Sequence, residues 1–511
     1  MDKQVFRTLI RKRFAVAIML LAQLALIIFT LYSRSGASKL LSTALSLLSL
    51  AVCLYIIGKK EKGAFKLTWV FLILIFPIFG GLFYLMFRTQ QPSKKIAAIY
   101  EERSRKVRDY MCLPQDSFEL ACNELPMHAP QIKYLQNYAG FPIFTATETE
   151  YLSPGELFFE RLLEELKKAE KYIFLEFFII QEGRMWDEIL NVLREKADKG
   201  ILVRVLYDDM GCFLKLPVKY EEKLKSYGIE CIVFNPFRPV LSSIQNNRDH
   251  RKIAVIDGKV AFTGGVNLAD EYINEVQKFG HWKDCAVMLR GKAAWSLTLA
   301  FLHMWGISAN IDEDYSVFFP WYESACDTSD DGFVQPYADS PTDNDNVGEH
   351  VYLQMINRAE KYIYINTPYL IIDDSMVSAL CLAAKSGIDV RIVTPHKWDK
   401  RLVHMTTRSY YRELINNGVK IYEYSKGFIH SKTFLCDDTT AVVGTTNLDF
   451  RSLYLHFECG VWMYNSKAVM QLKDDFMETL RSCQQITERD CHCNIFLRQF
   501  QEILRLFAPL M

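Results

Sequence analysis

The sequence has no excess of charge of either sign, because 60 lysines and arginines are balanced by 60 aspartates and glutamates. Proteins that bind nucleic acid through its phosphates usually concentrate positive charge. The balance therefore gives no reason to expect a nucleic acid partner. At 511 residues, the chain is long enough for more than one domain with a substantial core.

The 13 cysteines lack the spacing of a disulfide framework, and no Cys-x-x-Cys pair occurs. An odd number of scattered cysteines is typical of a protein in a reducing compartment. We therefore expect the large C-terminal part of the chain to lie in the cytoplasm. Cys491, His492 and Cys493 resemble a fragment of a metal site, but the sequence offers no matching second set of ligands, and an incidental grouping is the simpler interpretation.

Three apolar runs near the N-terminus, residues 14–32, 40–57 and 67–87, contain no Asp, Glu, Lys or Arg. Each has 18 to 21 residues, enough for a helix to span a bilayer core of roughly 30 Å. The sequence predicts a membrane anchor over residues 1–90 with these runs as transmembrane segments. A signal peptide is the alternative for the first run, although no small-x-small cleavage site ends it. Lys and Arg around the runs are balanced, so the positive-inside rule does not fix the orientation.

The rest of the chain contains an internal repeat. The segment AEKYIFLEFFI at 169–179 corresponds to AEKYIYINTPY at 359–369. Each copy alternates amphipathic helical patterns with short apolar runs rich in β-branched and aromatic residues, which predicts an α/β fold with a largely parallel sheet. We expect two homologous α/β halves in a pseudo-twofold arrangement, over residues 146–326 and 347–490.

Three further segments connect or extend these parts. Residues 91–145 are expected to link the anchor to the first half. Residues 327–346 form an acidic, Pro- and Gly-punctuated stretch, which is typical of a linker. Residues 491–511 predict an amphipathic helix whose apolar face packs on the body, with the bilayer surface as the alternative.

Both halves carry the same sparse set of polar residues. The first copy recurs at a constant offset of 180 residues, and the pairs are His250/His430, Lys252/Lys432, Asp257/Asp437, Gly264/Gly444 and Asn267/Asn447. In a strand, residues i and i+2 share a face, so the His and Lys of each copy project together. Chance is a poor explanation for five residues that recur in register.

A phosphodiester is the substrate class that this set suits. Ammonium groups and side-chain amides donate to anionic oxygens. The candidates for phosphate binding are Lys252, Lys432, Asn267 and Asn447. One neutral imidazole can attack phosphorus while the other, protonated, donates to the leaving oxygen. The residues themselves do not tell which of His250 and His430 is the nucleophile.

Four carboxylates accompany the motifs. Asp284 lies 34 residues after His250, and Glu458 lies 28 residues after His430, each in an apolar, strand-like context. A lone carboxylate there would be costly, so we expect Asp284 and Glu458 to orient the imidazoles. Asp257 and Asp437 lie at the expected hairpin turns, where a chemical role and a turn-stabilising role are both open.

These residues resemble the phospholipase D superfamily, in which H-x-K-x4-D occurs twice with a trailing G-[GT]-x-N. The segments NNRDHRKIAVIDGKVAFTGGVNLADEY and VGTTNLDFRSLYLHFE resemble bacterial cardiolipin synthases more narrowly. The resemblance implies transphosphatidylation between two phosphatidylglycerol molecules in a lipid bilayer. His250 would take the phosphatidyl group, and His430 would deprotonate the acceptor hydroxyl. It also implies that no metal or other cofactor is needed, because one phosphodiester replaces another of similar energy.

Two features depart from that family's pattern. The chain has three apolar runs instead of two, and Thr445 and Thr446 replace residues that are often small. A membrane-bound phospholipase D that uses water as acceptor is the nearest alternative. A non-catalytic membrane scaffold is another, but the motif is intact in both halves, and a scaffold has no need of both imidazoles.

Overall fold

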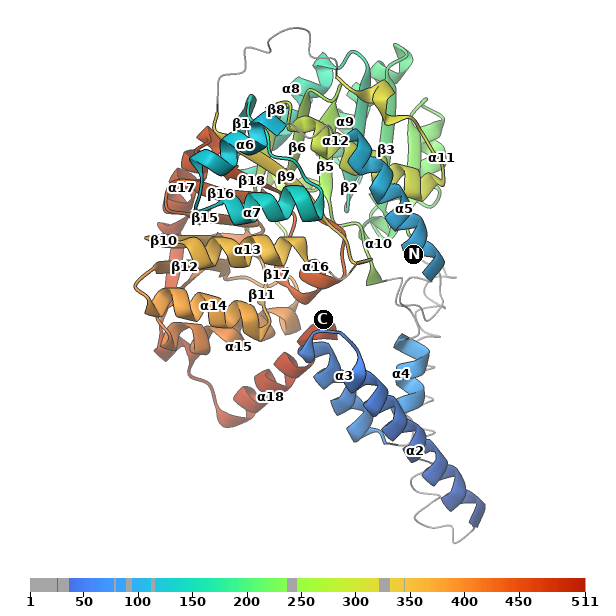
Figure 1. The fold of residues 1–511 in the computed structure, drawn as a ribbon, viewed down its shortest axis with the longest axis vertical. Coiled ribbons are helices and arrows are strands. Elements are labelled where there is room, and N and C mark those ends of the chain that lie inside the picture. Colours follow the sequence, from blue (N-terminus) through green and yellow to red (C-terminus); the bar gives the residue numbers. More distant parts are fainter. Residues whose placement is uncertain are drawn as a thin grey trace. The chain divides into compact units, whose positions relative to one another are not determined.

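A computed structural model of the chain describes Ala25 and residues 36–77, 80–88, 94–111, 115–236, 246–320, 331–343 and 345–510 (Figure 1). The chain divides into two compact units. The first contains Met1–Lys95, Phe237–Asn247 and Glu502–Met511, and the second contains Ile96–Pro236 and Arg248–Gln501.

The first unit contains three apolar helices: α2 (Gly36–Gly58), α3 (Gly63–Ile75) and α4 (Gly80–Arg88). They share a small buried cluster in which the rings of Trp69 and Tyr84 meet edge to face, with centroids 5.1 Å apart. Within the part of the chain that the structure describes, one helix, Lys39–Gly58, is long and apolar enough to cross a membrane. Several leucines of α2 are exposed, which suits a helix whose surroundings are lipid.

The other two apolar runs have different outcomes. Residues 14–32 lie outside the described residues, apart from Ala25. Residues 67–87 were expected to form one continuous span, but α3 ends at Ile75 and α4 begins at Gly80. Pro77 lies in this interruption, where its ring and missing N–H oppose an unbroken helix.

The C-terminal helix α18 (Ile495–Leu506) ends against α3. Thr68 Oγ1 donates to the Leu506 carbonyl (2.6 Å). On α18 itself only Leu504 is buried, whereas Phe496 is 83% exposed and Phe500 is 42% exposed. Most of the apolar face of α18 is therefore exposed among the described residues.

The first half of the second unit forms a seven-stranded sheet in the order β1-β8-β6-β5-β2-β3-β4. Its strands are β1 (Thr147–Leu152), β2 (Tyr172–Phe177), β3 (Leu202–Asp208), β4 (Glu230–Phe234), β5 (Lys252–Ile256), β6 (Val260–Gly264) and β8 (Ala286–Gly291). The lysine of the first motif is thus the first residue of the central strand β5.

The second half forms an eight-stranded sheet in the order β19-β13-β12-β10-β15-β16-β18-β9. Its strands are β9 (Phe333–Asp339), β10 (Tyr362–Asn366), β12 (Asp389–Pro395), β13 (Lys420–Tyr424), β15 (Thr433–Cys436), β16 (Thr440–Gly444), β18 (Glu458–Tyr464) and β19 (Cys483–Ile486). Read from the β9 edge, this order repeats that of the first sheet with β19 added. The expected duplication is confirmed, and β9 lies within the segment expected to be an acidic linker.

The expectation of largely parallel sheets is wrong. In each half, three strands pair in parallel (β2-β3-β4 and β10-β12-β13), whereas the motif strands pair antiparallel with their neighbours. The cause is the hairpin inside each motif, because a short turn can join only antiparallel strands. Asp257 and Asp437 adopt positive φ values of 53° and 56° in these turns.

The two sheets bury their inner faces in one shared core. Along β5, Ile253 and Val255 belong to this core together with Leu435 and Val443 of the second sheet, while Ala254 faces an outer core. This alternation is the period of two that a strand imposes. Helices α12 (Ala294–Ala309) and α17 (Lys467–Leu480) also belong to the shared core.

The remaining long helices cover the outer faces of the sheets (Figure 1). They are α8 (Gly155–Lys168) and α9 (Arg184–Asp198) in the first half, and α13 (Val347–Arg358), α14 (Asp374–Lys385) and α15 (Arg401–Asn416) in the second. Residues 91–145, which were expected to link the anchor to the first half, contain α5 (Lys94–Tyr110), α6 (Gln115–Glu124) and α7 (Ala129–Lys133). This segment packs on the body, since Trp295 Nε1 donates to the Tyr110 carbonyl (2.9 Å).

Candidate active site

The two motif histidines occupy equivalent places just before β5 and β15. The backbone N–H of His250 donates to the Phe457 carbonyl (3.0 Å), and that of His430 donates to the Lys283 carbonyl (2.7 Å). Phe457 and Lys283 each stand directly before a candidate orienting acid. The backbone of each motif is therefore bound to the opposite half at the same relative position.

A buried carboxylate from the opposite half contacts each imidazole. Nδ1 of His250 lies 2.9 Å from Oε1 of Glu458, and Nδ1 of His430 lies 2.6 Å from Oδ2 of Asp284. Both carboxyl groups have no exposed surface. A carboxylate can only accept when it is ionised, and in that state each pair places the hydrogen on Nδ1 and leaves the lone pair of Nε2 for other chemistry.

This pairing is crossed with respect to the sequence. Each acid follows the motif histidine of its own half in the sequence, yet His250 contacts Glu458 of the second half and His430 contacts Asp284 of the first. Further donors hold the two acids: Thr445 Oγ1 donates to Glu458, and the Cys285 N–H donates to Asp284 (2.9 Å). Thr445, a departure from the family's small residues, thus has a definite contact.

Both motif lysines are buried beside their histidines. Lys252 Nζ lies 2.5 Å from the His250 carbonyl oxygen, and Lys432 Nζ lies 2.8 Å from Nδ1 of His430. Burial lowers the pKa of Lys252 to about 8 and that of Lys432 to about 7, although the nearby acids oppose the change. Two cations held this deep favour an anionic ligand, which would restore their usual affinity for protons.

The two motif asparagines differ in their contacts. Asn267 Oδ1 accepts from the Ile179 N–H (3.0 Å), and its Nδ2 donates to the Tyr272 hydroxyl (2.7 Å). One amide hydrogen of Asn267 remains for a ligand. Asn447 is also buried, and its Oδ1 has no hydrogen-bond partner among the described residues. Asn447 is therefore the less constrained of the two candidates for phosphate binding.

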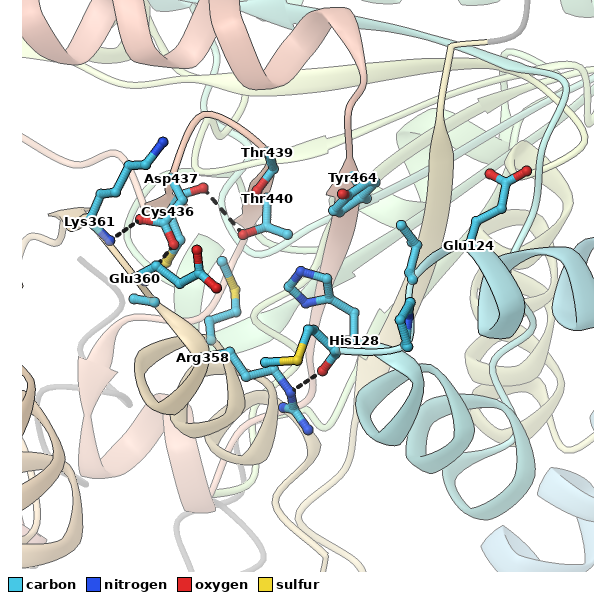
Figure 2. A pocket seen from close by; sticks show the side chains of 15 residues that line it. Glu124, His128, Arg358, Glu360, Lys361, Cys436, Asp437, Thr439, Thr440 and Tyr464 are labelled. Atoms are coloured by element: carbon cyan, nitrogen blue, oxygen red, sulfur yellow. Dashed lines mark hydrogen bonds between the residues drawn. The ribbon is translucent and has the colours of Figure 1, made fainter.

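Asp257 and Asp437 have the turn-stabilising role. Asp257 accepts from the N–H groups of residues 170, 171 and 172, and Asp437 accepts from those of residues 360, 361 and 362, at 2.7–2.9 Å. Figure 2 shows Asp437 at the edge of a pocket of about 280 Å³ that includes Lys361 and His128. A strand rises about 3.3 Å per residue, so each Asp lies roughly 20 Å from its motif histidine. This geometry favours the turn-stabilising role over a chemical one for both aspartates.

The electrostatics of the two histidine–carboxylate pairs are unequal. Burial and the Lys252 charge hold the pKa of His250 well below its usual range, and burial raises the pKa of Glu458 to about 8. Burial also lowers the pKa of His430, to about 4, but its partner Asp284 has a lowered pKa because His430 and Lys432 stabilise the carboxylate. The ionised Asp284 makes His430 the imidazole better able to carry a positive charge.

Sequence reasoning missed several rings around the histidines. Those of Trp282 and Tyr272 lie 5.2 and 5.6 Å from the His430 ring. The ring of His456 lies 5.6 Å from that of His250. A signal for His456 was present, because it stands two residues before Glu458, and residues i and i+2 share a face of an extended segment.

Comparisons with known proteins agree with this geometry. The family model described as "Cardiolipin synthase, PLD-like domain" matches residues 162–288 and again residues 352–480, so its two copies coincide with the two sheets. The chain belongs to this family. A second model, described as "Phospholipase_D-nuclease N-terminal", matches residues 44–88, which cover most of the three apolar helices.

Similar sequences within this phospholipase D-like family span most of the chain. A cardiolipin synthase of Geobacillus sp. is 36% identical over 93% of this chain and 94% of its own length. Cardiolipin synthase 2 of Bacillus cereus is 38% identical over 87% of this chain and 86% of its own length. An uncharacterised protein of Streptococcus mutans is 40% identical over 90% of this chain and 99% of its own length.

The fold also occurs among solved structures. The crystal structure of a phosphatidylserine synthase of Haemophilus influenzae superposes with a TM-score of 0.54, covering 73% of this chain and 96% of that one. The sequences are 14% identical, so this likeness concerns the fold alone. The two-sheet body is thus found in another protein outside the close relatives.

Proposed function

We propose that the protein is a cardiolipin synthase that transfers a phosphatidyl group from one phosphatidylglycerol to another, giving cardiolipin and glycerol. The observation that carries the proposal is the pair of buried imidazoles, His250 and His430, each bound through Nδ1 to a carboxylate of the other half. The family supports the same reading, since the named relatives are cardiolipin synthases. The chain is accordingly a phosphatidyltransferase of the phospholipase D type.

The first half of the reaction forms a phosphohistidine. Nε2 of neutral His250 attacks the phosphorus of the donor lipid, a P–N bond forms, and the P–O bond to the head-group glycerol breaks. His430, protonated once the anionic lipid is bound, gives its Nε2 proton to the departing oxygen. Lys252 and Lys432 stabilise the charge on the phosphoryl oxygens, with the asparagine amides as further donors.

The second half reverses these steps with a new alcohol. His430 takes the proton from a head-group hydroxyl of the second phosphatidylglycerol, whose oxygen attacks phosphorus as the P–N bond breaks. His250 is released neutral. The assignment of His250 as nucleophile and His430 as acid and base is supported by the ionised partner of His430, which favours an imidazolium there.

We also propose that the protein crosses the membrane more than once, with its catalytic body in the cytoplasm. Support comes from the apolar run at residues 14–32, which precedes the helix of spanning length found within the described residues, and from the shorter apolar helices α3 and α4 that follow it. The eleven described cysteines are all free thiols, as a reducing compartment predicts. The substrates would then reach the site from the surrounding bilayer.

A reconstituted assay tests the proposed reaction. The full chain in proteoliposomes is given phosphatidylglycerol labelled in its head group, with EDTA present, and the lipids and water-soluble products are separated by chromatography. Cardiolipin and free glycerol in equal amounts are expected. Phosphatidic acid without cardiolipin would instead identify a hydrolase, and loss of turnover in EDTA would identify a metal requirement that the proposal excludes.

A further inference from the structure

A third histidine, His456, lies beside the proposed nucleophile and is not used by the mechanism above. Its ring centroid is 5.6 Å from that of His250, and its Nδ1 is 3.9 Å from the carboxylate of Glu458. The side chain is 11% exposed. Neither ring nitrogen has a hydrogen-bond partner in the part of the chain that the structure describes. Burial of an imidazole without a hydrogen-bond partner costs free energy, unless a ligand supplies the missing hydrogen bonds.

The backbone brings two arginines to the same place. The His456 N–H donates to the Arg451 carbonyl (2.9 Å), which folds the end of α16 (Phe450–Tyr454) back toward the site. The next N–H, that of Phe457, donates to the Arg248 carbonyl (2.9 Å). Arg248 comes from the first half and Arg451 from the second, so this group forms only where the halves meet.

A lysine adds a further positive charge. Lys400 stands just before α15, with its ammonium 5.6 Å from the centroid of the Tyr369 ring. It is exposed and has no ion pair among the described residues. The pKa of His456 is held well below its usual range, first by burial and then by the charges of Arg451, Lys252, Arg248 and Lys400.

The acids nearby do not cancel this charge. Asp208 pairs with Arg248 at 3.5 Å, and burial raises its pKa to about 7, so its negative charge is partial near neutral pH. The carboxylate of Asp449 caps α16 by accepting from the Ser452 N–H (2.8 Å). Burial lowers the pKa of Arg451, and the charge of Arg248 lowers it further, against the opposing effect of Asp449. Glu458 is the nearest acid, but burial raises its pKa to about 8, so it too carries only part of a negative charge near neutral pH. The positive side chains therefore outweigh the acids beside His250.

We propose that His456, Arg451, Arg248 and Lys400 form a second phosphate site, which holds the phosphodiester of the acceptor lipid. The inference rests on the proposed transphosphatidylation. In that reaction the acceptor is itself a phosphodiester, and its own phosphate lies one glycerol away from the hydroxyl that attacks. A site for this phosphate next to His250 positions the hydroxyl and favours a lipid acceptor over water.

A metal ion fits this place less well than a phosphate does. Ligand atoms of His250, His456 and Glu458 lie within 4.8 Å of one another, a spacing that a metal ion can bridge. A divalent cation there would meet the charges of the surrounding arginines and lysines, which repel it. An anion gains from every one of these charges. The surrounding positive charges therefore favour a phosphate over a metal ion.

Two reactions measured side by side test the acceptor site. Proteoliposomes containing the full chain are assayed for cardiolipin formation and for exchange of labelled free glycerol into phosphatidylglycerol. Glycerol exchange uses the donor site and both motif histidines, but its acceptor carries no phosphate. The variants are His456→Ala, His456→Gln, which keeps an N–H donor, and Lys400→Ala at an exposed position. Lys385→Ala, at the exposed end of α14, is the matched control.

We expect His456→Ala and Lys400→Ala to lower the ratio of cardiolipin formation to glycerol exchange about tenfold or more, the usual effect of losing a charge-assisted hydrogen bond. His456→Gln should recover part of the ratio, and Lys385→Ala should leave it unchanged. An equal loss of both reactions would make His456 a positioning residue for His250 and overturn the inference, as would an unchanged ratio. If the wild-type protein catalyses neither reaction, the proposed function itself fails and the acceptor site with it.

Discussion

Oε1 of Glu458 lies 2.9 Å from Nδ1 of His250, although 208 residues separate them in the chain. The reciprocal contact joins His430 to Asp284 at 2.6 Å. Each histidine therefore depends on the opposite half for its orientation and tautomer. Duplication alone would give two independent sites, whereas this exchange of acids makes one site that needs both halves.

Replacement of either orienting acid should impair catalysis without removing a reacting group. Glu458→Gln and Asp284→Asn keep the size of the side chain but replace the carboxylate that contacts Nδ1 with an amide. We expect kcat to fall about 10- to 100-fold for each, the usual effect of losing such a partner. Steady-state kinetics on mixed micelles of phosphatidylglycerol measure this. A variant with normal kcat would show that its carboxylate does not orient the imidazole.

The two motif histidines should be separable by trapping. His250→Ala and His430→Ala should each lower turnover by about 10²-fold or more, because each removes a proton-transfer or nucleophilic group. After a short incubation with acyl-labelled phosphatidylglycerol and acid-free denaturation, label should remain on the His430→Ala chain and be absent from the His250→Ala chain. The opposite distribution would exchange their roles. His404→Ala, on α15, serves as control.

The motif aspartates should matter for stability more than for chemistry. Asp257→Ala removes three hydrogen bonds from a carboxylate that is 7% exposed, and Asp437→Ala removes the same three at a more exposed turn. We expect each to lower the free energy of unfolding by about 1–3 kcal/mol, with the larger loss for Asp257. Thermal unfolding and kcat are compared. A large fall in kcat with unchanged Tm would instead show that Asp257 and Asp437 take part in the reaction.

Much of this arrangement followed from the sequence. The repeat predicted two equivalent α/β halves, and the recurrence of His250 and Lys252 at His430 and Lys432 predicted that these residues share one site. The alternation in β5 also followed, since a period of two is a local property of a strand. These features depend on local pattern and on register, which the sequence carries directly.

What the sequence did not predict depends on contacts between the halves. The crossed pairing of His250 with Glu458 follows from how two sheets pack, and no local pattern encodes it. The exact place of His456 is set by the backbone bonds that join residues 248 and 457. The mixed sheets could have been anticipated, because the Asp257 hairpin requires antiparallel neighbours. The alternation of helices and strands in the sequence suggests parallel pairing, but the hairpins impose antiparallel pairing on the motif strands.

The buried lysines should give activity and stability opposite responses to pH. Their pKa values in the folded protein, about 8 for Lys252 and about 7 for Lys432, lie below the value of about 10.4 for an exposed lysine. Above pH 7 to 8 the folded protein loses these protons, so phosphate binding weakens and kcat/KM for phosphatidylglycerol should fall.

Over the same range the unfolded chain still binds both protons. Because stability rises with pH wherever the unfolded state binds more protons, the lysines' contribution to the free energy of unfolding should increase between about pH 7 and 10 and be constant below about pH 6. The test compares Tm from pH 6 to 10 for the wild type and a Lys252→Met, Lys432→Met variant. The difference between the two curves, which removes all other titrating groups, should shift in favour of the wild type as pH rises. A difference that is independent of pH would mean that the lysines have ordinary pKa values in the folded protein. Their protonation would then not depend on a bound phosphate.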